Sequence, residues 1–432
     1  MAGEWTTLPL EDCMAAIIDY RGKTPEKTSF GVPLVTAKVI KGGRIETPDE
    51  FIAEADYEAW MRRGIPQRGD IVMTTEAPLG EVAQLNGTKI ALAQRVITLR
   101  GKSDLIDNTF LKFLMQSSAF QEGLKARATG TTVLGIRQSE LRKVDLTFPP
   151  FHTQRAIAHV LGTLDDLIEL NRETNEILEE MARALFKSWF VDFDPVRAKL
   201  EGRPPAGMDA ETAKLFPDHF EDSELGQIPR GWEVVTVSDL CEINGWTLRK
   251  GDQLPRLEYV EISAVKRGEI GEMPVYRRGE EPSRARRRLR HGDTVMSTVR
   301  PDRGAYFLAL NPPTDRVAST GFAVLSPSCA PWSFLHAALT QPEVFDRLGH
   351  LADGGAYPAI RSEIIGAIQT AKPDNEAVLR AFHDVCAPIF EMVDAHRRES
   401  RELATLRDTL LPKLLSGEVS VPEAEKLVAS PT

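Results

Sequence analysis

The chain has 432 residues, 42% of them hydrophobic and 27% charged, and a formal net charge of −10. This length is too great for one ordinary hydrophobic core, and the composition excludes a globally disordered chain. No apolar run reaches membrane-spanning length, the first residues lack the regions of a signal peptide, and four scattered cysteines form no CxxC pair. We therefore expect a cytoplasmic protein of two or more domains that does not bind a membrane.

Residues 1–150 predict a first α+β domain. Its strand-like segments are short, rich in Val, Ile and Thr, and separated by Gly and Pro. They include the phrase "RGDIVMTTE" (68–76) and the run "IALAQRVITLR" (90–100). A helical stretch (108–125) and a glycine-centred turn (128–141) complete the domain.

Residues 151–200 predict a first long helix, because good helix formers dominate and apolar residues recur at heptad spacing. The columns of this stripe are Ile157, Leu164, Leu178 and Leu185, and Leu161, Ile168, Ala182 and Trp189. Asn171 and Asn175 interrupt the stripe near its centre. Residues 201–230, rich in Pro, Gly and acidic residues, predict an exposed linker.

Residues 231–373 repeat the organisation of the first domain. The phrase "HGDTVMSTV" (291–299) matches residues 68–76 at an offset of 223 residues. A strand run (316–326), a helical stretch (331–348) and a glycine-centred turn (353–364) follow in the same order. This agreement predicts a duplication. The second copy also holds nine arginines against four acidic residues between positions 277 and 303, and we expect the arginines of 284–290 to meet phosphates.

Residues 374–416 predict a second long helix, and residues 417–432 a frayed tail. The apolar column is Phe382, Ile389, Leu403 and Leu410, with His396 in its middle and Val385, Met392 and Leu406 beside it. Pro388 lies inside this pattern and should kink or restart the helix.

The two long stripes leave two structures open. Each helix could cover its own domain, or the two could pair as an antiparallel coiled coil. Pairing is favoured, because both stripes are longer than one small domain needs and each carries a polar residue at its centre. Asn171 and His396 are the candidate register residues of such a pair.

The sequence offers no catalytic or metal-binding motif. It has no GxxxxGK[ST], HExxH or GxSxG pattern. The string "NPPT" (311–314) lacks the aromatic residue of an adenine methyltransferase motif, and no glycine-rich turn that could hold S-adenosylmethionine precedes it. "DFDPVRAK" (192–199) is better explained as the exit from the first long helix than as a nuclease site. We expect no catalytic residue, no metal and no cofactor in this chain.

Several stretches resemble the DNA specificity subunit of type I restriction–modification systems. They are "ALFKSWFVDFDPVRAKLEG" (184–202), "ELGQIPRGWEV" (224–234), "FPPFHTQRAIAHVLGTLDDLIELN" (148–171) and "LRDTLLPKLLSGEVSV" (406–421). The resemblance covers essentially the whole chain, although "AKPDNEAVL" (371–379) lacks the Pro-Pro and Gln found at the entry to the first helix.

The resemblance implies a non-catalytic subunit with two target-recognition domains, each reading half of a split target in double-stranded DNA. It implies two methyltransferase subunits docked on the helices and restriction subunits that act as endonuclease and translocase. S-adenosylmethionine, ATP and magnesium would then be bound by those partners. A self-sufficient methyltransferase or nuclease, and a coiled-coil adaptor that binds only protein, are the alternatives.

Residues near the repeated phrase and the glycine-centred turn are the candidate DNA contacts, because Arg and Gln suit bidentate contacts with base edges. In the first domain they are Thr75, Gln94, Arg95, Thr131, Thr132 and Arg137. In the second they are Arg300, Arg303, Ser319, Thr320, Tyr357 and Arg361. A role as ordinary exposed surface is the alternative for each.

Overall fold

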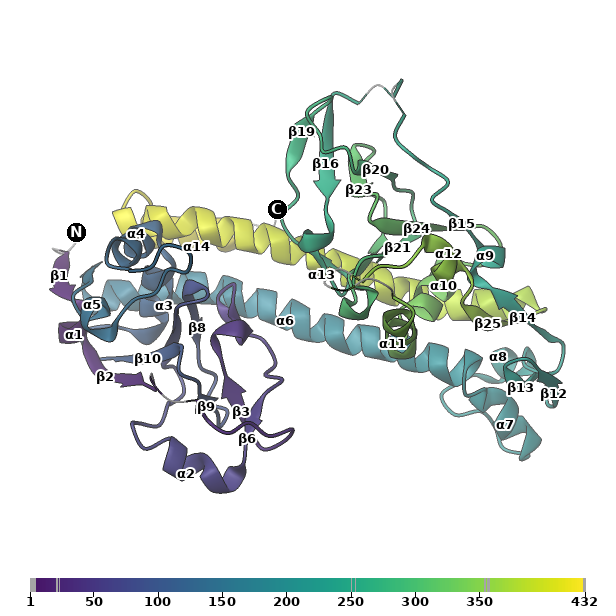
Figure 1. The fold of residues 1–432 in the computed structure, drawn as a ribbon, viewed down its shortest axis with the longest axis horizontal. Helices are drawn as coiled ribbons and strands as arrows, with labels where there is room; N and C mark the ends of the chain where they lie inside the picture. The colour runs from purple at the N-terminus through teal and green to yellow at the C-terminus, as the bar shows by residue number, and fades with distance from the viewer. Residues whose placement is uncertain are drawn as a thin grey trace. The chain divides into compact units, whose positions relative to one another are not determined.

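The computed structural model describes residues 5–20, 22, 24–249, 251–252, 254–352, 355 and 358–429. The chain divides into two compact units, one of Met1–Glu169 with Ser400–Thr432 and one of Leu170–Glu399. Each unit contains an α+β domain and a part of both long helices, α6 (Phe151–Phe190) and α13 (Glu376–Ser416) (Figure 1). Among the described residues, no helix combines the length and apolar character needed to cross a membrane.

The first unit is built on a four-stranded antiparallel sheet in the order β2–β10–β7–β8, beside a smaller sheet in the order β6–β3–β9. Its strands are β1 (Thr6–Pro9), β2 (Met14–Asp19), β3 (Val32–Val35), β4 (Ile40–Lys41), β5 (Arg44–Ile45), β6 (Phe51–Ile52), β7 (Ile71–Thr75), β8 (Leu79–Gln84), β9 (Ala91–Leu92), β10 (Val96–Gly101) and β11 (Asp145–Phe148). Its helices besides α6 and α13 are α1 (Leu10–Cys13), α2 (Tyr57–Trp60), α3 (Asn108–Gln116), α4 (Ser118–Ala126), α5 (Gln138–Leu141), α14 (Val421–Ala429) and the 3-10 turns η1 (Ala37–Val39) and η2 (Glu54–Asp56).

The second unit has a four-stranded sheet in the order β15–β24–β21–β22 and a second sheet in the order β19–β16–β23–β20. Its strands are β12 (Phe220–Ser223), β13 (Gly226–Pro229), β14 (Trp232–Thr236), β15 (Cys241–Ile243), β16 (Arg256–Val260), β17 (Val265–Lys266), β18 (Glu269–Ile270), β19 (Val275–Arg277), β20 (Ala285–Arg288), β21 (Asp293–Ser297), β22 (Tyr306–Ala309), β23 (Arg316–Ser319), β24 (Phe322–Pro327) and β25 (Gln369–Pro373). Its other helices are α7 (Asp194–Leu200), α8 (Ala210–Lys214), α9 (Val237–Leu240), α10 (Trp332–Leu339), α11 (Pro342–His350), α12 (Ser362–Gly366) and the 3-10 turns η3 (Ile262–Ala264) and η4 (Pro301–Arg303).

The predicted duplication is confirmed by the strand order. The central sheets have the same sequence of neighbours, and the outer pairs β1–β11 and β14–β25 and the hairpins β4–β5 and β17–β18 correspond as well. In both units a parallel pair, β3–β9 or β16–β23, joins the second sheet. Strand β20 extends the second sheet in the second unit, and no strand among the described residues of the first unit corresponds to it.

The repeated Gly-Asp of the opening phrase builds the turn that leads into the central strand. Gly69 and Gly292 both have positive φ, +87° and +83°, a conformation that favours glycine. Asp70 accepts a hydrogen bond from the Gln67 amide (2.8 Å), and Asp293 accepts one from the Arg290 amide (2.7 Å). The phrase therefore recurs because the same buried turn starts β7 and β21.

Helices α6 and α13 pack antiparallel against each other, as predicted. In the first unit, Nη1 of Arg407 lies 2.6 Å from Oδ1 of Asp165. In the second, the rings of Phe186 and Phe382 lie 6.0 Å apart. The mutual seam is part of the hydrophobic core of both units.

The polar residues at the centre of the helix stripes meet in the second unit. The Asn171 amide donates to Glu399 Oε2 (2.9 Å). Nδ1 of His396 lies 2.9 Å from Oδ1 of Asn175, whose own amide donates to the Val393 carbonyl (3.3 Å). The direct partner of His396 is thus Asn175, which is 8% exposed, and not Asn171.

Two expectations about the second helix are wrong. Val385 and Met392 are 49% and 48% exposed, so they do not flank the seam; Phe390 and Val393 are buried instead. Pro388 does not restart the helix, since α13 is continuous from Glu376 to Ser416. Pro388 and Asp384 are both exposed, so the carbonyl that the proline ring leaves without a donor can face water.

The linker and the tail are also more ordered than expected. The hairpin β12–β13 forms between residues 201 and 230, and Phe216 and Ile228 from that stretch are buried in the core of the second unit. The tail contains α14, whose Ala424 is fully buried in the core of the first unit. Apolar residues spaced among the acidic and proline residues supply these contacts, which composition alone conceals.

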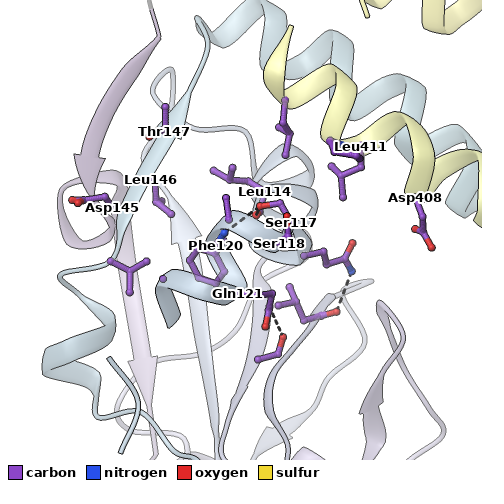
Figure 2. A pocket seen from close by; sticks show the side chains of 18 of the residues that line it. Leu114, Ser117, Ser118, Phe120, Gln121, Asp145, Leu146, Thr147, Asp408 and Leu411 are labelled. Carbon is purple, nitrogen blue, oxygen red and sulfur yellow. Dashed lines mark hydrogen bonds between the residues drawn. The ribbon is translucent and has the colours of Figure 1, made fainter. Parts of the chain in front are cut away.

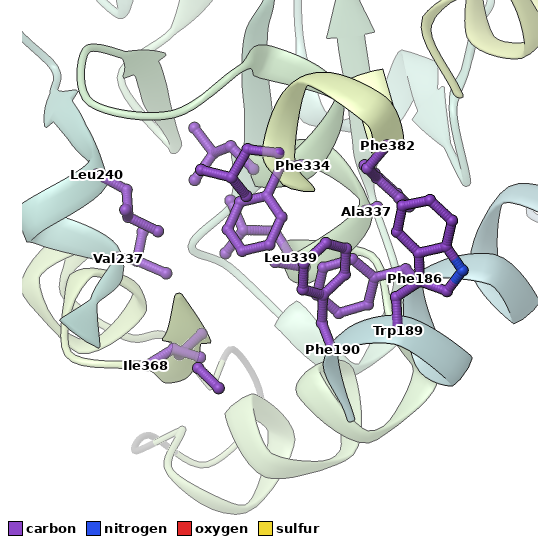
Figure 3. Close-up of a cluster of buried hydrophobic side chains, with 14 of the residues drawn as sticks. Phe186, Trp189, Phe190, Val237, Leu240, Phe334, Ala337, Leu339, Ile368 and Phe382 are labelled. Carbon is purple, nitrogen blue, oxygen red and sulfur yellow. The ribbon is translucent and has the colours of Figure 1, made fainter. Parts of the chain in front are cut away.

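The second unit has a core rich in aromatic rings (Figure 3). Phe190 of α6 lies 4.9 Å from Phe334 of α10 and 5.2 Å from Phe382 of α13, each measured between ring centres at a steep angle. Trp189 lies 5.9 Å from Phe382. Such edge-to-face contacts stabilise a core beyond the area that they bury.

We predict that Asp165→Ala destabilises the protein by about 3–5 kcal/mol, because it leaves the largely buried Lys112 without its ion-pair partner and removes one of the two carboxylates that pair with Arg407, the other being Asp408. Asp165 pairs with both Lys112 of α3 and Arg407 of α13, and these three side chains are only 10–19% exposed. Denaturant-induced unfolding monitored by circular dichroism measures the change. The exposed neighbour Asp166 is the matched control, and Asp166→Ala should change the unfolding free energy by about 0.5 kcal/mol or less. Equal effects of the two variants would contradict the prediction.

A pH dependence follows from His336, which is 5% exposed and shares a 3.2 Å hydrogen bond with Thr294. Burial, with a smaller contribution from the charge of Arg397, lowers the pKa of His336 to about 3. In the unfolded chain the His336 imidazole binds a proton near pH 6.5, whereas in the folded chain it stays neutral at that pH. The free energy of unfolding therefore falls as the pH drops below about 6.5.

The loss should be about 1.4 kcal/mol for each pH unit below about 6.5. We expect the free energy of unfolding to fall more between pH 7.5 and 5.5 in the wild type than in His336→Leu. The comparison is of slopes, so the constant cost of losing the Thr294 hydrogen bond cancels. Parallel curves would show that His336 takes up its proton in the folded state.

Candidate nucleic-acid interface

The central sheet of the first domain gathers four segments at one edge. β2 and β7 both run antiparallel to β10, with Asp19 opposite Ile97 and Thr74 opposite Val96. The carboxyl ends of β2 and β7 therefore lie beside the start of β10, and Leu79 at the start of β8 pairs with Thr75. We call residues 75–79 and 93–96 the first edge, together with the loop 129–137, whose Ile136 amide donates to the Thr75 carbonyl.

Thr75 joins the segments of the first edge. Its amide and its hydroxyl both donate to the Arg95 carbonyl, at 2.9 and 3.2 Å, and its own carbonyl accepts from the Ile136 amide at 3.0 Å. Thr75 is 3% exposed. The structure thus places this predicted DNA contact inside the edge, where its hydroxyl proton is already donated.

Arg95 projects from the first edge and forms an ion pair with Glu76. Nε of Arg95 lies 2.7 Å from Oε1 of Glu76, and the two side chains are 50% and 44% exposed. Gln94 beside them is half-buried. Glu76 is not among the predicted DNA contacts. Its position within the repeated phrase, where the second copy has Val299, is the sequence signal that points to it.

A tight loop completes the first edge. Thr129 and Gly135 exchange two backbone hydrogen bonds, at 2.8 and 2.9 Å, and Gly135 also bridges Glu76. The predicted contacts Thr131 and Thr132 are exposed at the loop tip, and Arg137 is exposed just after the loop. Val133 and Leu134, 54% and 44% exposed, share the tip and were not selected.

The second domain repeats this construction at residues 297–304, 319–322 and 358–361, which we call the second edge. The amide and hydroxyl of Thr298 both donate to the Gly321 carbonyl at 2.9 Å, and the Ile360 amide donates to the Thr298 carbonyl at 2.8 Å. The Arg300 amide donates to the Pro358 carbonyl at 2.7 Å.

The predicted contacts of the second domain fall into three groups. Arg303, Thr320 and Arg361 are exposed at the second edge, and Arg300 is partly exposed with a left-handed backbone (φ 47°). Ser319 is 3% exposed, and its hydroxyl accepts from the Gly321 amide at 3.2 Å. Tyr357 lies outside the described residues. The structure therefore gathers the described members at one edge, and their contact with DNA stays a prediction.

Most of the arginines of 284–290 are less available for contact with DNA phosphates than their number suggests. Arg288 stacks on Trp246, with its guanidinium carbon 3.9 Å from the ring centre, and Arg290 lies 3.2 Å from Glu242. Arg286 lies 3.6 Å from Glu281, which also pairs with Arg278. Burial lowers the pKa of Arg287. Of these side chains, Arg284 and Arg290 are the exposed ones.

A pocket of about 1440 Å³ lies in the first unit between α4, β8, β11 and the end of α13 (Figure 2). Leu114, Phe120 and Leu411 form part of its apolar wall, and Gln121 donates to the Gly80 carbonyl at 2.9 Å. None of the predicted DNA contacts lines this pocket. Leu79 of the first edge does line it.

The acidic string at the end of α6 is held by neighbouring basic residues. Asp192 pairs with Lys187, and Lys199 donates to the Phe216 carbonyl, each at 2.5 Å. Within the part of the chain that the structure describes, no three His, Cys, Asp or Glu residues are grouped so that they could hold a metal ion. The contacts of this string serve the exit from α6 into α7.

The comparisons with known proteins agree with one another. Residues 16–180 match the type I restriction modification DNA specificity domain. The chain is 27% identical over 379 residues to the type I restriction enzyme HindI specificity subunit of Haemophilus influenzae, covering 76% of this chain and 81% of that protein. It is 24% identical over 361 residues to the MjaIX specificity subunit of Methanocaldococcus jannaschii, covering 82% and 79%.

A solved structure has the same fold. The S subunit of a type I restriction–modification system from M. genitalium superimposes with a TM-score of 0.53 and 17% sequence identity, and the match covers 96% of each chain. The duplicated domains, the paired helices and the sequence similarity along most of the chain are consistent with one another. Residues 16–180 carry the type I restriction modification DNA specificity domain, and along about three quarters of its length the chain is similar to type I restriction enzyme specificity subunits.

Proposed function

We propose that this chain is the non-catalytic subunit that gives a type I restriction–modification complex its DNA sequence specificity. The first edge reads one half of a bipartite target and the second edge reads the other half, with an unread spacer between them. The observation that carries this proposal is the pair of edges. They share one backbone construction but present different side chains, such as Arg95 in one and Arg300 in the other.

The duplication gives the chain two domains of one construction, and a bipartite target has two half-sites. Proteins that read two half-sites commonly present an equivalent reading unit to each of them. Each domain can then meet its half-site in an equivalent way. Because the side chains at the two edges differ, the two halves of the target should differ in sequence.

The paired helices supply a surface for partner subunits. Leu170, Ile177 and Met181 of α6 are 54–59% exposed, and Val385 and Met392 of α13 are about half exposed. Exposed apolar stripes at helical spacing suit an amphipathic partner helix. We propose that two methyltransferase subunits dock on these helices, that restriction subunits join the complex, and that S-adenosylmethionine, ATP and magnesium are bound by those partners.

One experiment separates this function from a self-sufficient enzyme. The purified chain, incubated with labelled S-adenosylmethionine and DNA, should transfer no methyl group, whereas the chain combined with its methyltransferase subunits should methylate adenine within a bipartite site. Methylation by the chain alone would contradict the proposal. A complex that enriches no bipartite site from random DNA would point to a protein-only adaptor.

Exchanging residues 1–150 for the first domain of a relative should alter one half of the target and leave the other half unchanged. The reason is that each edge is built within one domain. Sequencing of methylated adenines in cells that carry the exchanged subunit gives the result. The reciprocal exchange of residues 231–373 is the control and should alter the opposite half. Changes in both halves after a single exchange would refute the modular reading.

Inserting one heptad into each of α6 and α13 should lengthen the unread spacer. Seven helical residues add about 10 Å, which corresponds to about 3 base pairs at 3.4 Å each. Methylated-adenine sequencing again reports the spacer. Point substitutions of exposed helix residues, such as Glu173→Gln, serve as the control and should leave the spacer unchanged. An unchanged spacer after the insertion would show that the helices do not set it.

A further inference from the structure

The same three hydrogen bonds around a threonine hold the backbone of both edges, and we call them the brace. The two edges differ in the side chains at the positions that the brace holds. In each domain a threonine donates twice to one carbonyl, that of Arg95 or of Gly321, and accepts from the amide of an isoleucine, Ile136 or Ile360. The residue after the threonine is Glu76 in the first domain and Val299 in the second. Equivalent backbone positions therefore hold an ion pair in one domain and no charge in the other.

The brace fixes where the Arg95 side chain begins. Its carbonyl accepts two hydrogen bonds from Thr75, and its neighbour Val96 is fully buried at the start of β10. Glu76 is fixed as well, because its backbone bridges Gly135. The 2.7 Å ion pair thus joins two side chains on well-held backbone, although about half of each is exposed to solvent.

An exposed ion pair of this kind contributes little to stability. Stability therefore does not explain why Glu76 and Arg95 are paired at the first edge. Glu76 contacts the guanidinium at Nε. The two terminal nitrogens of an arginine form the fork that matches N7 and O6 of guanine, which is the commonest specific arginine contact with DNA. A carboxylate at Nε restrains the rotation of that fork before DNA arrives.

We propose that Arg95 reads a guanine in the half-site of the first domain and that Glu76 is a positioning residue for it. This inference rests on the proposed function and adds one base of the target to it. The second domain lacks this pair, since Gly321 and Val299 occupy the equivalent places. Its half-site is therefore read without this contact.

The second domain also provides the variant that tests the proposal. Replacing the pair by the residues found there, Glu76→Val with Arg95→Gly, should keep the fold, because the same brace carries these residues at the second edge. The variants Arg95→Ala, Glu76→Val and Glu76→Gln separate the two roles. The control is the ion pair of Lys89 with Glu54, which is similarly exposed in the same domain, changed as Glu54→Ala with Lys89→Ala.

Each variant is combined with its methyltransferase subunits in cells, and methylated adenines are sequenced. Arg95→Ala should reduce the preference for guanine at one position of one half-site by about tenfold or more. Glu76→Val should reduce the preference for guanine at the same position by a smaller factor. The preference in Glu76→Gln should lie between those of Glu76→Val and the wild type. The double variant should equal Arg95→Ala, because a positioning residue has no effect once its arginine is gone. The other half-site and the control pair should be unaffected.

Two results would overturn the inference while leaving the proposed function intact. One is that the base preference at every position of the bipartite site is the same in Arg95→Ala as in the wild type. The other is relaxation of different positions by the Glu76 and Arg95 variants. A wild-type complex that methylates no bipartite site would instead remove the proposed function and this inference together.

Discussion

The packing of α6 against α13 is the interaction on which the structure depends. Each α+β domain buries its apolar face on this pair, so the helices are part of the core and not an appendage. In the first unit Asp165 ties α6 to both α3 and α13. In the second unit aromatic rings join the two helices, because Phe382 of α13 contacts Phe186, Trp189 and Phe190 of α6. In the second unit an ion pair between Glu179 of α6 and Arg397 of α13 adds to these aromatic contacts.

The duplication and the helix pair were accessible from the sequence, because both are periodic. A repeated phrase and a heptad stripe survive in the order of residues even where identities differ. Errors arose where a contact depends on a particular side chain. Val385 and Met392 fit the heptad count but face solvent, and Pro388 is accommodated because it too is exposed. Spacing identifies a helix face only to within about one residue, which is enough to exchange Met392 for Val393.

The edges show the same limit at the level of function. The repeat in the sequence predicts which loops carry the candidate contacts, and the structure gathers the described loops at the two sheet edges. The residue order alone does not reveal that the Thr75 hydroxyl donates to a main-chain carbonyl, nor that Arg286, Arg288 and Arg290 pair with Glu281, Asp252 and Glu242. Those pairings join residues far apart in the chain or depend on burial. Glu76 was overlooked for the same reason, since its meaning comes from its ion pair with Arg95.

The threonine brace has a consequence for how such a protein can evolve. The two hydrogen bonds of the brace that reach position 95 or 321 both end on the main-chain carbonyl there, so they do not depend on the side chain at that position. Arginine and glycine are both tolerated already, within a single molecule. If Arg95 reads a base as proposed, a substitution there changes that contact while both hydrogen bonds to its carbonyl can stay in place. A lineage could drift from one recognition sequence to another in single steps, each of them a fully folded protein.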